Sequence, residues 1–353
     1  MTDTVGIGML GTGFIGQFHH QGLRHVAATR PVACFGRDPE RRAAFAARNG
    51  YTHAVDSIEA VCADADVDLV IVSLPNALHV QAVDTAARHG KAVACTKPLG
   101  RTGAEAAAAL ASVSAAGVWH GYLENVVFGA EMLRMREMVE ADAIGRPISF
   151  RAREAHSGPH AAHFWDHATA GGGALLDMAS HGTEAARYLF GKQLRIRDVF
   201  AWGDTLVHGD RTTAEDNAVM LMRFEDGRVA TIDVSWSSKG GLEGRFELTG
   251  TSGRVVYDMA ATPMRAFIEQ PAGYLAEKAD AATGWVFPVP DETYVHGHDA
   301  MMAHMVEAFR ASVAPRETFH DGLIVNQVLD AAYRSMTSGR WEPIELDSAV
   351  MAA

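Results

Sequence analysis

A carboxylate, Asp177, stands four residues before an imidazole, His181, which is the side chain that can gain or lose a proton near neutral pH. They follow a glycine triplet, residues 171–173, in a stretch that reads as a helix. Side chains four residues apart project from one helix face, so the carboxylate can orient the imidazole for proton transfer. The plainer alternative is an ion pair on a solvated helix. The neighbouring Gly, Ala, Leu and Met residues favour a packed helix, in which a polar pair needs bonded partners.

A lysine suited to the same chemistry follows a predicted strand at residues 91–95. Lys97 comes just past the carboxyl end of this strand, and Pro98 stops regular pairing there. Ligands of open α/β sheets bind at the carboxyl ends of strands, where an amine can give or take a proton. The alternative is a surface lysine in a loop.

Residues 5–16 combine a predicted buried strand, Val5–Leu10, with three spaced glycines and the start of a helix. Gly11 allows a tight turn, Gly13 lets the backbone approach a pyrophosphate, and Gly16 lets helix and strand pack closely. The amide groups and dipole of the helix then favour an anion. We therefore predict a dinucleotide site whose contacts are Gly11, Thr12, Gly13, Phe14, Ile15 and Gly16.

The second predicted strand, residues 31–36, ends where a ribose-binding acidic residue usually stands. Here Gly36 takes that place, and Arg37 and Asp38 follow. Asp38 precedes a proline and suits the N-cap of a helix better than a ribose contact. Arg37 can bind a 2′-phosphate and stack on adenine, or it is a solvated surface arginine. We favour NADP over NAD as the cofactor.

Another cofactor contact is predicted at Ser73, Leu74, Pro75 and Asn76, after the strand 67–73. Pro75 prevents the strand from continuing, and Asn76 offers both a donor and an acceptor. The alternative role for Asn76 is to cap the next helix, and the two roles are compatible.

Residues 156–167 are rich in histidine. We rank a loop lining a substrate pocket first, a merely polar loop second and a metal site last, because no Cys or Glu completes a zinc signature. The predicted substrate contacts are His156, His160, Trp165 and Asp166, and no metal is expected.

The chain has 353 residues and a net charge of −12. This length predicts two domains, or three, and the acidic balance without a basic run argues against nucleic acid. Three cysteines in apolar contexts fit a reducing compartment. Neither a secretory signal nor an apolar run long enough for a membrane span is present, so we expect a cytoplasmic protein.

Strands and helices alternate over residues 1–124, which predicts a doubly wound parallel sheet, the Rossmann fold. Residues 125–353 change rhythm: strands at 219–224 and 229–236 flank an Asp226-Gly227 turn that is typical of a hairpin. We therefore predict an α/β protein with an N-terminal nucleotide-binding domain. Its C-terminal α+β domain has an open, mostly antiparallel sheet, and the terminal helices are free to pack back on the first domain.

Four segments together resemble the Gfo/Idh/MocA oxidoreductases, named for glucose–fructose oxidoreductase and inositol dehydrogenase. They are Gly11–Gly16, Leu74–His79, Gly90–Leu99 and Gly171–His181, and the resemblance extends from about Val5 to Ser338. It implies an NAD(P)-dependent dehydrogenase or reductase acting on a sugar, cyclic polyol or glycoside. It also implies that the face of the open sheet forms a homodimer contact, sometimes within a homotetramer.

We predict the following roles for the residues above. His181 is the general base in oxidation and the general acid in reduction, and Lys97 binds the reacting oxygen, although the two could exchange roles. Asp177 holds a substrate hydroxyl or fixes the His181 tautomer. The remaining expected contacts are His79, Thr96 and Lys97 for the cofactor, and Glu124, Asn125 and Asp177 for the substrate.

The sequence departs from the family pattern in three places. Thr96 stands where the family has Glu, Gly36 where it often has an acidic residue, and Glu124-Asn125 where it often has an arginine-rich segment. One alternative function is a redox-neutral epimerase or glycoside-cleaving enzyme that retains its dinucleotide. A less favoured one is a non-catalytic dinucleotide sensor.

Overall fold

The computed structural model describes residues 4–259, 266–269, 283–286 and 291–344. It divides into two compact units. The first comprises residues 1–125 and 297–326, and the second comprises residues 126–296 and 327–353. The division after Asn125 lies one residue beyond the boundary expected from the sequence, and the segment 297–326 belongs to the first unit.

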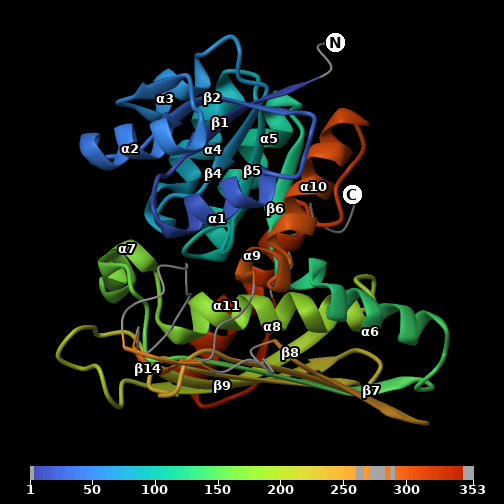
Figure 1. The fold of residues 1–353 in the computed structure, drawn as a ribbon. Coiled ribbons are helices and arrows are strands. Elements are labelled where there is room, and N and C mark those ends of the chain that lie inside the picture. The colour runs from blue at the N-terminus through green and yellow to red at the C-terminus, as the bar shows by residue number, and fades with distance from the viewer. Residues whose placement is uncertain (1–3, 260–265, 270–282, 287–290, 345–353) are drawn as a thin grey trace. The chain divides into compact units, whose positions relative to one another are not determined.

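The first unit contains a parallel six-stranded sheet in the order β3-β2-β1-β4-β5-β6 (Figure 1). Every residue of the central strand β1 is buried, as expected for a parallel sheet covered on both faces. Its strands are β1 (Val5–Leu10), β2 (Thr29–Phe35), β3 (His53–Val55), β4 (Leu69–Val72), β5 (Ala92–Thr96) and β6 (His120–Leu123).

The helices of the first unit are α1 (Phe14–Leu23), α2 (Pro39–Asn49), α3 (Ile58–Cys62), α4 (His79–Arg88), α5 (Gly103–Ala116) and α10 (His298–Arg310), with the short 3₁₀ helix η1 (Asn76–Leu78). Helix α10 comes from the C-terminal part of the sequence and packs against α1. The long helix α11 (Phe319–Ser338) begins in the first unit and ends in the second.

The second unit contains a seven-stranded sheet in the order β12-β11-β7-β10-β9-β8-β15. Only β7 and β10 pair in parallel, so the sheet is mostly antiparallel. Its strands are β7 (Pro147–Ala155), β8 (Ile196–Asp204), β9 (Asn217–Phe224), β10 (Val229–Ser235), β11 (Glu243–Gly250), β12 (Arg254–Asp258) and β15 (Glu342–Pro343). The strands β13 (Ala266–Ile268) and β14 (Gly284–Val286) form a separate pair.

Helix α8 (Ala174–Phe190) lies along one face of the seven-stranded sheet and contacts β7, β9 and β10 (Figure 1). Nearly all of its residues are buried, so it forms the core of the unit. The other helices are η2 (Val126–Phe128), α6 (Ala130–Glu140), η3 (Ala162–Trp165), α7 (His167–Ala170) and α9 (Glu292–Val295). The predicted fold class, a Rossmann sheet followed by an open, mostly antiparallel sheet, is confirmed.

Candidate active site

The glycine-rich turn after β1 is built by close approach of backbone segments. Gly11 has a φ of +113°, and a Cβ atom there would lie 2.1 Å from the carbonyl oxygen of Ser73. A Cβ atom at Gly16 would lie 2.1 Å from the carbonyl oxygen of Gly11, whereas one at Gly13 would meet nothing within 4 Å. The tight turn at Gly11 and the close packing at Gly16 are therefore confirmed, and the backbone at Gly13 remains approachable.

The end of β2 explains why an acidic residue is missing there. A Cβ atom at Gly36 would lie 2.2 Å from Thr12 Oγ1, so the Thr12 side chain fills this place. Asp38 Oδ1 accepts a hydrogen bond from the Arg41 amide at 2.9 Å, which confirms its predicted role as the N-cap of α2. Arg37 is exposed.

Residues after β4 are buried beside the turn. Ser73 Oγ lies 2.7 Å from His19 Nδ1, so this hydroxyl is engaged within the unit. Burial lowers the pKa of His19 to about 3 and keeps its imidazole neutral at physiological pH. Asn76 is buried and is the first residue of η1, whose N-cap is Pro75, while the N-cap of α4 is Leu78. Asn76 therefore does not stand at the N-cap position of either helix.

His79 ties together two loops at the carboxyl edge of the parallel sheet. Its Nε2 lies 2.8 Å from the carbonyl oxygen of Leu74, and its Nδ1 lies 2.9 Å from that of Pro98. Burial lowers the pKa of His79, although both carbonyl groups favour the protonated ring. The side chain is fully buried, and both of its nitrogens face protein carbonyls. It therefore bridges the two loops from within the protein interior. The expected direct contact of His79 with a cofactor is corrected accordingly.

Lys97 follows the last residue of β5, Thr96, directly and is half-buried. The loop beyond it is fixed by Asn326 of α11, a residue that the sequence did not single out. Asn326 Nδ2 donates to the Gly100 carbonyl at 2.7 Å, and its Oδ1 accepts from the Gly100 amide at 3.3 Å. Of the residues after β6, Glu124 is buried and Asn125 is half-buried.

Asp177 and His181 lie on α8 and are only 7% and 6% exposed. This confirms the packed helix and excludes the solvated one. Asp177 Oδ2 accepts a hydrogen bond from Trp236 Nε1 at 3.2 Å. Trp236, which follows β10, is a partner that sequence reasoning missed.

The histidine-rich segment contains a buried indole, that of Trp165. Trp165 Nε1 donates to the Pro159 carbonyl at 3.1 Å, and its ring lies 5.4 Å from that of Trp236. The guanidinium carbon of Arg211 lies over the Trp165 ring, 3.7 Å from the ring centroid. A cavity of about 540 Å³ is lined by Trp165, Asp166, His167, Ala168, Gly209, Asp210, Arg211, Thr212 and Thr213.

Two other predicted residues of this segment, Asp166 and His156, have local structural roles. Asp166 caps α7 by accepting from the Ala168 amide at 3.2 Å. His156 is buried, and its Nδ1 accepts from the Gly158 amide at 3.0 Å, whereas His160 is exposed. Trp165 and Asp166 thus line the same cavity, whereas His156 and His160 do not line it.

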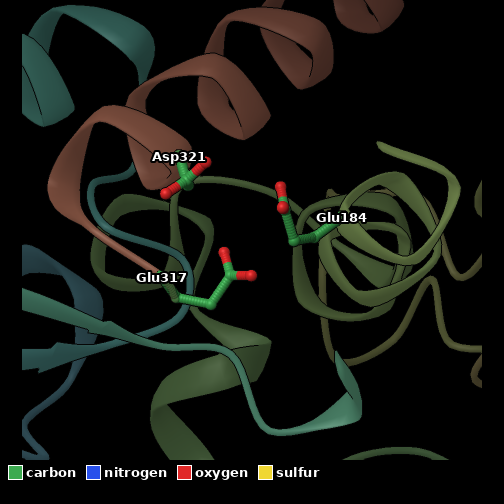
Figure 2. A group of neighbouring side chains, drawn as sticks. All are labelled: Glu184, Glu317 and Asp321. Atoms are coloured by element: carbon green, nitrogen blue, oxygen red, sulfur yellow. The ribbon is translucent and has the colours of Figure 1, made fainter. Parts of the chain in front are cut away.

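Figure 2 shows three further carboxylates, which sequence reasoning did not select: Glu184, Glu317 and Asp321. Within the second unit, Glu184 of α8 pairs with Arg187 and with Lys192 Nζ at 3.2 Å. Within the first unit, Asp321 Oδ2 accepts from the Thr318 amide at 2.9 Å at the start of α11. Ion pairing and helix capping account for these two carboxylates.

Comparison with known proteins identifies the protein family to which this Rossmann fold and its glycine-rich turn belong. Residues 5–122 match the model of the oxidoreductase family with an NAD-binding Rossmann fold, and residues 132–256 match that of the GFO/IDH/MocA C-terminal domain. The chain is therefore an oxidoreductase with an NAD-binding Rossmann domain. It belongs to the Gfo/Idh/MocA family, as the sequence motifs predicted.

Three similar proteins illustrate the family. The 1,5-anhydro-D-fructose reductase of Ensifer adhaerens is 30% identical over 70% of this chain and 74% of its own length. The myo-inositol 2-dehydrogenase of Thermotoga maritima is 29% identical over 71% and 75%. The crystal structure of GenD2 from gentamicin A biosynthesis, in complex with NAD, has a TM-score of 0.90 and 28% identity, and the match covers 98% of both chains. Relatives of this chain are thus sugar and polyol dehydrogenases and reductases.

No helix within the described residues is both long enough and apolar enough to cross a membrane.

Proposed function

We propose that this protein transfers a hydride between NADP or NAD and a secondary hydroxyl or ketone of a sugar, cyclic polyol or glycoside. The observation that carries the proposal is the order β1-β4-β5 in the parallel sheet. The glycine turn, Asn76 and Lys97 follow these three adjacent strands, so they lie at the same edge of the sheet.

The residues at this edge fit a dinucleotide. A side chain at Gly11 or Gly16 would clash with backbone, while the approach to Gly13 is open. The N-cap of α1 has no side-chain hydrogen bond, and its first turn has no acidic residue to repel a pyrophosphate. A bound nicotinamide supplies the hydride acceptor or donor.

The protein's own residues handle the proton. In oxidation, His181 takes the proton of the substrate hydroxyl, while Lys97 donates a hydrogen bond to the same oxygen and stabilises its developing charge. In reduction, His181 returns the proton to the oxygen. Asp177 holds a substrate hydroxyl or fixes the tautomer of His181, and the exchange of roles between Lys97 and His181 remains the alternative assignment. The cavity lined by Trp165 and Asp166 supports these two residues as substrate contacts.

A substrate panel tests the proposal. Hexoses, inositols and glycosides are incubated with NAD and with NADP, and absorbance at 340 nm is followed together with product analysis. We expect reduced cofactor to form in a 1:1 ratio with oxidised product. Product without net absorbance change supports the redox-neutral enzyme, and tight cofactor binding without any turnover supports the dinucleotide sensor.

The preference for NADP is supported by the end of β2. Thr12 occupies the place of an acidic ribose reader, Asp38 is used as a cap, and Arg37 is exposed to receive a phosphate. We expect Arg37→Ala to lower kcat/KM for NADP by about 10- to 100-fold, because charge-assisted hydrogen bonds contribute about 1.5–3 kcal/mol. The value for NAD should change little.

The control for this prediction is Arg48→Ala, which removes an exposed arginine from the far end of α2. Equal losses with both cofactors in Arg37→Ala would contradict the assignment.

We place the protein in the cytoplasm. Cys34, Cys62 and Cys95 are free and buried, which is in keeping with a reducing compartment.

A further inference from the structure

The N-terminus of α8, the helix that carries Asp177 and His181, is capped from outside the helix. Its N-cap residue, Gly173, has no side chain to satisfy the first amides. Glu215, in the loop before β9, supplies the acceptors instead. Its Oε1 accepts from the amides of Gly173 at 3.1 Å and Leu175 at 2.9 Å, and its carbonyl oxygen accepts from the amide of Ala174 at 2.9 Å.

The glycine triplet leaves the space that this cap requires. A Cβ atom at Gly173 would lie 1.9 Å from the Glu215 carbonyl oxygen, and one at Gly172 would lie 2.1 Å from the hydroxyl of Tyr333. That hydroxyl donates to Glu215 Oε1 at 3.0 Å. Burial raises the pKa of Glu215, whereas these donors and the helix dipole favour its carboxylate.

The next residue, Asp216, organises a different segment. Its carboxylate accepts from three successive amides, those of Leu206, Val207 and His208, at 2.7–2.8 Å. The loop held in this way continues into residues 209–213, which form one wall of the cavity beside Trp165.

Trp236 connects helix α8 with the loop that Asp216 holds. Its backbone amide donates to the Asp216 carbonyl at 2.7 Å, its carbonyl accepts from His208 Nε2 at 3.0 Å, and its indole donates to Asp177. The helix position, the loop position and the Asp177 carboxylate are therefore fixed by one network within the second unit.

We propose that Glu215 and Asp216 are paired positioning residues: Glu215 sets the placement of α8 with Asp177 and His181, and Asp216 sets the cavity wall formed by residues 206–213. The inference rests on the proposed function, because it treats α8 and this cavity as parts of the substrate site. Neither carboxylate is assigned to proton transfer.

Glu215 is tested with Glu215→Ala, Glu215→Gln and Tyr333→Phe. At temperatures well below unfolding, we expect Glu215→Ala to lower kcat by about 10- to 100-fold, because small misplacements of reacting groups have effects of this size. The KM for the cofactor should stay within about twofold, since the glycine turn is untouched. Glu215→Gln retains an oxygen acceptor and should recover much of the rate, and Tyr333→Phe should give a smaller loss. These milder variants keep the test usable if Glu215→Ala does not fold.

Asp216→Asn tests the other half, since an amide keeps the shape but loses the negative charge that three amides share. We expect the KM for the sugar or polyol to rise by about 10-fold, with a smaller change in kcat. The control is Glu225→Ala, which removes an exposed carboxylate from the β9–β10 turn and should leave both constants unchanged.

Amide hydrogen exchange separates this inference from the proposed function. Glu215→Ala should speed exchange at residues 173–175, and Asp216→Asn should speed it at residues 206–208, whether or not a substrate has been found. Unchanged exchange at these amides, or a wild-type kcat in folded Glu215→Ala, would overturn the inference. A wild-type protein that turns over no compound of the panel, with the expected exchange changes, would overturn only the proposed function.

Discussion

Lys97 and His181 stand on two different kinds of element. Lys97 follows β5 in a loop that Asn326 fixes at Gly100, whereas His181 stands on a buried helix. Neither residue lies in an exposed loop: Lys97 is half-buried and His181 is buried. The proposed mechanism requires one fixed group for the hydroxyl proton and another for the developing oxyanion.

Replacing either residue by alanine tests their roles directly. We expect Lys97→Ala and His181→Ala each to lower kcat by about 10²- to 10⁴-fold, since removal of a positioned acid–base group has losses of this size. Initial rates at saturating cofactor and substrate measure the effect. Lys239→Ala and His25→Ala, which remove an exposed lysine and an exposed histidine, serve as controls. Near-wild-type turnover in both Lys97→Ala and His181→Ala would contradict the mechanism.

The burial of Asp177 could be predicted from the sequence, but the hydrogen-bond partners of the site residues could not. The apolar neighbours of Asp177 indicated a packed helix, and the structure confirms its burial. Its donor, Trp236, stands 59 residues away, and Asn326 stands 226 residues from Gly100. Such pairings are set by tertiary packing, so no local pattern of spacing marks them.

Helix α4 shows how one element can organise two loops of the site. Its first residue, His79, lies between the carbonyl groups of Leu74 and Pro98, which follow β4 and β5. A neutral imidazole has one N–H group and can donate to one of these carbonyls at a time. The two ring nitrogens lie 2.8–2.9 Å from the two carbonyl oxygens, so the packed ring spans the distance between the loops.

Substitution of His79 should act on cofactor binding more than on turnover. We expect His79→Phe to raise the KM for the cofactor at least about 10-fold and to lower the free energy of unfolding by about 1–3 kcal/mol, because it leaves a buried carbonyl without its donor. Steady-state kinetics and thermal unfolding measure the two effects. His89→Gln, at the opposite end of α4, removes only a contact with the exposed Glu59 and is the control. An unchanged cofactor KM in folded His79→Phe would contradict this role.

At the level of elements, the strand and helix alternation of residues 1–124 predicted the parallel sheet because each buried strand and amphipathic helix carries its own local pattern. The assignment of residues 297–326 to the first unit did not follow from any local pattern. Helix α10 packs on α1 so closely that a Cβ atom at Gly22 would lie 2.8 Å from the carbonyl oxygen of His298.

At the level of the whole molecule, the seven-stranded sheet has a face that no described helix of its own unit covers. Trp202 and Val219 are directly opposite each other on β8 and β9, and so are Phe200 and Leu221. Trp202 is 50% exposed, while the alternate residues of β9, such as Met220, are buried. Three of these side chains, Trp202, Val219 and Leu221, are exposed, and the half-buried Phe200 lies beside them with its ring 5.7 Å from that of Trp341. Exposed apolar side chains gathered on one face are typical of a protein interface.

We therefore expect this face to join two copies of the chain, alone or within a tetramer, in keeping with the family resemblance. The solution mass should be two or four times 37.9 kDa. The double substitution Val219→Asp with Leu221→Asp should reduce it, because desolvating four carboxylates across a symmetric interface is unfavourable. Light scattering during size-exclusion chromatography measures the mass, with Val313→Asp, a more exposed valine of the first unit, as the control. A wild-type protein that is monomeric at micromolar concentration, or a double variant that keeps the wild-type mass, would show that this face is not the interface.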